Sequence, residues 1–213
     1  ADGRPTVTLR RDEVLVRAAR IMVSVDTSKG AGPTAARTAI SVWAEVMGMG
    51  ILDGAYLILS WAQVVAYSDQ MAKIKSVCNA FRPHACLIED KSTGEVLCQQ
   101  LPRETDWVRC PIIPINPGAI GDKSTRMASV TPAMRDGQVW IPDRGSEPWL
   151  ADWEKELGFF PLGKHKDQGD SASQFLNWRR ANPLWTNDRY AWAIQKWIGA
   201  GPGLGQFIFR ADA

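Results

Sequence analysis

The feature that most constrains the fold is a short apolar run ending in an acid, Ile-Met-Val-Ser-Val-Asp at residues 21–26. Its β-branched residues, and the turn-like Thr-Ser-Lys-Gly that follows at residues 27–30, predict a buried core strand. Two further β-rich runs, residues 38–46 and 54–62, are joined by a glycine-rich connection and predict antiparallel partners for it. We therefore expect three antiparallel strands, the first of which ends in a carboxylate.

Strands and helices alternate after this unit. Apolar residues at helical spacing predict a helix over 67–81, and a second apolar run, residues 85–90, again ends in acids. The remaining expected elements are helices at 92–101, 123–135 (broken or kinked by Pro132), 148–157 and 167–180, a strand at 112–115, and a hairpin strand at 139–141. This order predicts an α/β fold in which a mixed sheet, three antiparallel strands followed by parallel strands, carries helices on both faces.

Composition and length are those of an ordinary globular domain. Of the 213 residues, 45% are hydrophobic and 23% are charged, close to the average for such chains. We expect residues 1–19 to be a linker or N-terminal extension, with an extra strand and turn as the alternative. Residues 20–213 are expected to form one domain.

Several functional classes are disfavoured. The net charge of +2 is too small to indicate a polyanion partner by itself. The four cysteines form no Cys-x-x-Cys pair and there are two histidines, so we expect reduced thiols in a cytosolic protein and no structural zinc. No signal-peptide pattern and no apolar run of about 18 residues occurs, which disfavours secretion and membrane insertion. The Gly-x-x-x-x-Gly-Lys-Ser/Thr loop of ATPases is missing too.

The carboxylates carry the main functional signal. Ligand sites in open α/β sheets lie at the carboxyl ends of strands, and Asp26 and Glu89 each end a predicted strand. If these strands are parallel neighbours, the two carboxylates meet and repel, and a divalent cation such as Mg²⁺ or Mn²⁺ would relieve the repulsion. Asp167 and Asp170 share a helix face and would supply enough acids for two ions. Two such ions about 4 Å apart can activate water for phosphodiester cleavage.

Each acid also has a structural explanation. Asp26 could cap a turn, and Glu89 with Asp90 could be exposed strand-end charge. Asp167 and Asp170 could be the N-cap and the N3 acid of a helix. The combination in this order favours the metal site over these separate explanations.

Four segments, in this order, resemble the C-terminal nuclease domain of tailed-phage terminase large subunits, which has a ribonuclease-H-like fold. They are the strand at 21–26 with Lys29 and Gly30, Leu-Ile-Glu-Asp-Lys-Ser-Thr-Gly at 87–94, Asp-Lys-Ser-Thr-Arg-Met-Ala at 122–128, and Phe160-Pro161 leading into residues 165–170. Lys166 departs from the family pattern, which often has the first acid of a pair at this position.

The resemblance implies that Asp26, Glu89 and Asp170 are the core ligands of two Mg²⁺ or Mn²⁺ ions, with Asp167 auxiliary. It further implies a two-metal endonuclease that cleaves double-stranded viral DNA during genome packaging in the cytoplasm of an infected bacterial host. By the same resemblance, the partners would be an ATPase motor domain, the small terminase subunit and the portal. No motor motif occurs in this chain, so it would be the nuclease portion.

Four basic residues are candidate DNA contacts. Lys29 and Lys91 each follow an acid-ended strand, and Lys123 and Arg126 share a helical face, although all four could be solvated surface.

Two other functions remain open. One is a different ribonuclease-H-like nuclease, such as a junction resolvase or integrase core. The other is a non-catalytic DNA-binding or capsid-docking module, which the Lys166 departure would suit.

Overall fold

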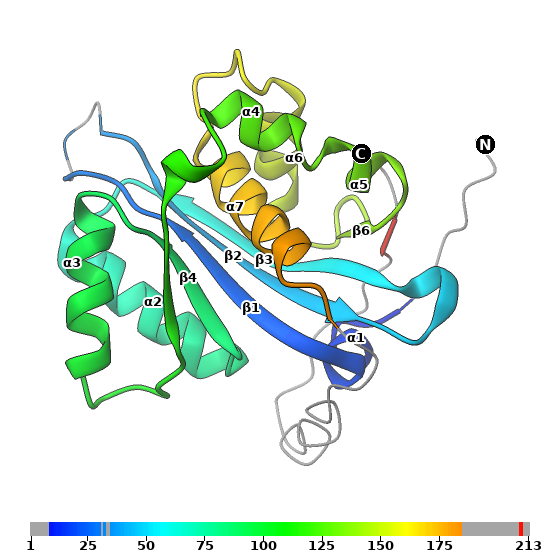
Figure 1. The fold of residues 1–213 in the computed structure, drawn as a ribbon, viewed down its shortest axis with the longest axis horizontal. Coiled ribbons are helices and arrows are strands. Elements are labelled where there is room, and N and C mark those ends of the chain that lie inside the picture. Colours follow the sequence, from blue (N-terminus) through cyan, green and yellow to red (C-terminus); the bar gives the residue numbers. More distant parts are fainter. Residues whose placement is uncertain (1–8, 31, 33–34, 185–208, 211–213) are drawn as a thin grey trace.

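The computed structural model describes residues 9–30, 32, 35–184 and 209–210. These residues form a sheet with strand order β5-β4-β1-β2-β3-β6-β7 (Figure 1). Strand β2 (Thr38–Val46) pairs antiparallel with β1 (Ala18–Asp26) on one side and with β3 (Gly54–Gln63) on the other. Strand β4 (Ala85–Glu89) pairs in parallel with β1, and β5 (Ile112–Ile115) pairs in parallel with β4. The predicted mixed sheet is confirmed.

Helices cover both faces of this sheet, as predicted. Alternate residues of β1 point to opposite sides, so Val23 and Val25 belong to one apolar cluster and Met22 to the other. The first cluster packs under α1 (Arg11–Arg17), α2 (Tyr67–Phe81) and α3 (Thr93–Gln100). The second packs under α5 (Thr131–Arg135), α6 (Leu150–Gly158) and α7 (Asp167–Ala181). None of the described helices has the length and apolarity needed to cross a membrane.

The N-terminal segment differs from the expectation. Residues 11–17 are helical and lead directly into β1, whereas a linker or an extra strand and turn was predicted there. Val14 is fully buried against the sheet. A short helix with few apolar residues leaves a weak periodic signal, and tertiary burial of one residue is enough to hold it.

One further prediction is refined and another is corrected. The helix expected over 123–135, broken or kinked by Pro132, is broken into α4 (Lys123–Ala128) and α5. The break lies before Pro132, which stands in the first turn of α5, where its missing N–H costs nothing. The strand β6 (Val139–Pro142) is not part of a hairpin. It pairs in parallel with β3 and antiparallel with β7 (Phe209–Arg210), which is distant in sequence.

Small polar residues bring α7 close to the sheet. Ser24 Oγ donates to the Ser171 carbonyl at 2.8 Å, and Ser171 Oγ donates to the Ser24 carbonyl at 2.9 Å. One turn later, Phe175 stacks on Trp43 of β2 with ring centroids 5.0 Å apart. These contacts lie under the centre of α7 and place the first turn of the helix at the carboxyl end of β1.

Candidate functional site

Two acids predicted from strand ends meet at the edge of the sheet. In the parallel β1–β4 ladder Val25 pairs with Ile88, so the next residues, Asp26 and Glu89, end neighbouring strands side by side. Asp26 is only 7% exposed, and Glu89 lies close enough to raise the pKa of its carboxyl group. The expectation that these strands are parallel neighbours is therefore confirmed.

Asp26, Glu89 and Asp170, together called the acid cluster below, bring several carboxyl groups close to one another. Burial raises the pKa of Asp26 well above its ordinary value, and the charge of Asp170 and the nearby Glu89 carboxyl group raise it further. Burial also raises the pKa of Asp170, although its basic partners oppose the shift. Proton uptake or a bound cation would lower the free-energy cost of burying these carboxylates near one another.

Two basic residues of α4 hold Asp170. Arg126 Nη2 lies 3.2 Å from Asp170 Oδ1, and the Lys123 ammonium forms an ion pair with Oδ2. The Arg126 guanidinium also donates to the Pro117 carbonyl at 2.9 Å. Arg126 is only 9% exposed, so it supports Asp170 from within the protein. This burial argues against the predicted contact between Arg126 and DNA.

The other predicted DNA contacts reach the surface. Lys29 follows β1, Lys91 follows β4, and both are exposed. The side chain of Lys123 is 47% exposed while it contacts Asp170. Lys123 contacts Asp170, and Lys29 and Lys91 follow the strands that end in Asp26 and Glu89.

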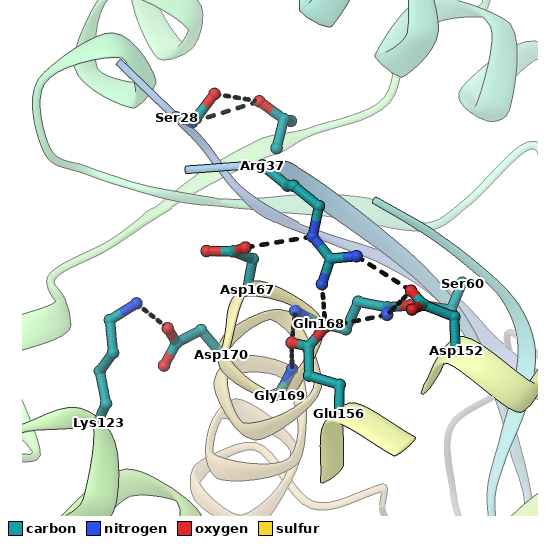
Figure 2. A network of polar contacts seen from close by, with 11 residues as sticks. Ser28, Arg37, Ser60, Lys123, Asp152, Glu156, Asp167, Gln168, Gly169 and Asp170 are labelled. Carbon is teal, nitrogen blue, oxygen red and sulfur yellow. Dashed lines mark hydrogen bonds and ion pairs between the residues drawn. The ribbon is translucent and has the colours of Figure 1, made fainter. Parts of the chain in front are cut away.

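Asp167 does not cap the helix that it begins. The N-cap position of α7 is Lys166, whose side chain makes no capping bond, so the structural alternative of an Asp167 N-cap with Asp170 at N3 is wrong. Glu156 of α6 caps α7 instead, accepting from the backbone N–H groups of Gln168 at 2.6 Å and Gly169 at 3.3 Å. Asp167 faces Arg37, with 3.5 Å between Oδ2 and Nε (Figure 2).

Three residues near the acids escaped the sequence analysis. Glu156 could have been suspected, because a lysine at an N-cap leaves backbone donors that another side chain must satisfy. Arg37 has no local signal, since a lone charge before a strand is common. Gln174 is another: its amide donates to Ser24 Oγ and to the carbonyls of Val25 and Leu87, which ties α7 to both acid-bearing strands.

The side chains of the acid cluster have the type of ligand atom, carboxylate oxygen, that a hard divalent cation prefers. Asp26, Glu89 and Asp170 offer carboxylate oxygens, the ligands that Mg²⁺ and Mn²⁺ prefer, and a cation would reverse the raised pKa values. Within the part of the chain that is described, no three acid, histidine or cysteine side chains already converge as a metal site. Lys123 contacts Asp170 Oδ2, so an ion bound to that oxygen would compete with Lys123.

Gly94 permits the close packing that positions Glu89. A Cβ at residue 94 would lie 1.9 Å from the Glu89 carbonyl oxygen and 3.2 Å from Thr27 Oγ1. We expect Gly94→Ala to lower the free energy of unfolding by about 1–3 kcal/mol, since the strand end must shift. Urea unfolding measures this, with Gly158→Ala as the control, because a Cβ there meets nothing within 4 Å. Equal stabilities for the two variants would contradict the packing argument.

Comparison with known proteins places the chain in a family. The model of the terminase RNaseH-like domain matches residues 23–179. Among solved structures, a Holliday junction resolvase of fowlpox virus aligns at 10% identity over 76% of this chain and 99% of its own, with a TM-score of 0.45. RuvC of Thermus thermophilus aligns at 13% identity over 76% and 96%, with a TM-score of 0.41. No curated protein matches the sequence. Since the family model covers most of the chain, including all four candidate acids, this protein belongs to the terminase ribonuclease-H-like domain family.

Proposed function

We propose that this protein is a metal-dependent endonuclease that cuts double-stranded viral DNA during genome packaging. The observation that carries the proposal is that Asp26 and Glu89 end adjacent parallel strands, with the buried Asp170 close enough for its charge to raise the pKa of Asp26. Membership of the terminase family supports the substrate. Burying carboxylates together in this way costs free energy unless a cation binds them. This cost favours a catalytic role over a purely structural one.

Each residue has a distinct part in this proposal. Asp26, Glu89 and Asp170 hold two Mg²⁺ or Mn²⁺ ions, with Asp167 as an auxiliary ligand. When bound, such ions lower the pKa of a water molecule and stabilise charge on the leaving oxygen of a phosphodiester. Arg126 orients Asp170, and the exposed Lys29, Lys91 and Lys123 contact the DNA backbone, where lysine acts as a point charge.

The biological setting follows from family membership. We propose that the domain works beside an ATPase motor domain, with the small terminase subunit and the portal as further partners. The place of action would be the cytoplasm of an infected bacterium. Copurification with a motor domain and a portal from infected cells would test this setting separately from the chemistry.

Metal removal tests the chemistry directly. Supercoiled plasmid incubated with the protein and Mn²⁺ should become nicked and then linear, EDTA should stop the reaction, and excess Mn²⁺ should restore it. Protein that is inert with Mg²⁺ and Mn²⁺ across pH, and that binds neither ion by calorimetry, would indicate a non-catalytic module. Strong preference for four-way junctions or RNA–DNA hybrids over duplex DNA would instead favour another nuclease of the same fold.

A further inference from the structure

Arg37 joins three carboxylates beside the acid cluster. It lies immediately before β2, and its side chain is 11% exposed. Nη1 contacts Asp152 Oδ2 at 3.0 Å, Nη2 forms an ion pair with Glu156, and Nε lies 3.5 Å from Asp167 Oδ2 (Figure 2). One guanidinium therefore links α6 to the first turn of α7.

The same network fixes the first turn of α7 against the sheet. Gln168 donates from Nε2 to Asp152 at 2.9 Å and to Glu156 at 3.0 Å, and its Oε1 accepts from Ser60 Oγ of β3 at 2.7 Å. Glu156 also caps the helix through its other oxygen. The turn that carries Asp167 and Asp170 is thus held by residues outside the acid cluster.

The two aspartates of this turn have different basic partners. Asp170 is bound by Lys123 and Arg126 of α4, whereas Asp167, one turn earlier in the helix, forms an ion pair with Arg37. The contact with Asp167 is the longest of the three that Arg37 makes. The Glu156 side chain is only 2% exposed, so losing Arg37 there would leave a buried charge unpaired. Asp152 is 61% exposed, so water can replace its contact with Arg37. Of the two buried partners, Asp167 makes the longer contact with Arg37, so its ion pair is the weaker of the two.

We propose that Arg37 is a positioning residue that withholds Asp167 from the metal-binding acids, so that the site takes one divalent ion tightly and a second only when Arg37 releases Asp167. This inference rests on the proposed function, since it assumes that the acid cluster binds metal. It assigns Arg37 control over the number of ions in the site.

Calorimetric titration with Mn²⁺, in the absence of DNA, tests the proposal. The wild-type protein should bind one ion tightly, and Arg37→Gln should show a second binding event or bind a second ion at least tenfold more tightly. The double variant Arg37→Gln/Asp167→Asn should lose that second event. Arg144→Gln is the matched control, because Arg144 is 78% exposed in its contact with Glu154, and its titration should equal the wild type.

Arg37→Lys covers the case in which Arg37→Gln fails to fold. A lysine can keep one ion pair with Glu156 but lacks the fork that also reaches Asp167, so it should fold and gain the second ion. Wild-type stoichiometry in every folded Arg37 variant, or a second event that survives Asp167→Asn, would overturn the role of Arg37 alone. Wild-type protein that binds no Mn²⁺ would overturn both this inference and the proposed function.

Discussion

Asp26→Asn is expected to reduce Mn²⁺-dependent plasmid nicking by about 10³-fold or more. Asparagine keeps the shape of the side chain but removes the charge that would bind the ion. A metal supplies several kcal/mol of charge stabilisation, and each 1.36 kcal/mol is a factor of ten in rate. Initial nicking rates from gels, at saturating Mn²⁺, measure the effect.

The same variant should fold at least as well as the wild type without metal. Burial raises the pKa of Asp26, so the folded state disfavours the ionised carboxylate that asparagine eliminates. A melting temperature no lower than that of the wild type would therefore separate loss of chemistry from loss of fold. Asp69→Asn, on the exposed first turn of α2, is the matched control and should nick at the wild-type rate. Retention of nicking within tenfold by Asp26→Asn would rule out Asp26 as an essential ligand.

Phe175→Ala is expected to cost about 3–5 kcal/mol of unfolding free energy, the range for deleting a fully buried phenylalanine. Phe175 and Trp43 are both fully buried, and their rings stack with an interplanar angle of 15°. This stack holds α7 on the sheet, so its loss should also weaken nicking by loosening the helix that carries Asp170. Urea unfolding in the presence of EDTA measures the change in the free energy of unfolding without any contribution from bound metal.

An exposed phenylalanine provides the comparison. Phe159 is 63% exposed, and Phe159→Ala should change stability by no more than about 0.5 kcal/mol. A cost below about 1 kcal/mol for Phe175→Ala would mean that the stack does not secure α7. Nicking that falls as far in Phe159→Ala as in Phe175→Ala would show that the loss of activity has another cause.

The strands that bear Asp26 and Glu89 are predictable because burial on both faces leaves continuous apolar runs, and each run here ends in an acid. The alternation of strands and helices predicts parallel strands, but it leaves open whether β1 and β4 are neighbours, which the ladder between them shows. The roles of Asp26 and Glu89 as metal ligands remain predictions.

Long-range partners could not be deduced in this way. Glu156 caps a helix that begins eleven residues later, and Arg37 finds Asp167 only because β2 lies under α7. The pairing of β6 with β7 likewise depends on where distant segments dock. Local sequence does not encode such contacts, so the alternative in which Asp167 caps the helix fails for a reason that lies outside its own segment.

The three principal acids come from β1, β4 and α7, segments well separated along the chain. During synthesis, the two strand acids are made long before the last helix, so an unfinished chain holds an incomplete ligand set. The ability to cut DNA would therefore arise only when α7 docks, which ties the timing of activity to completion of the domain.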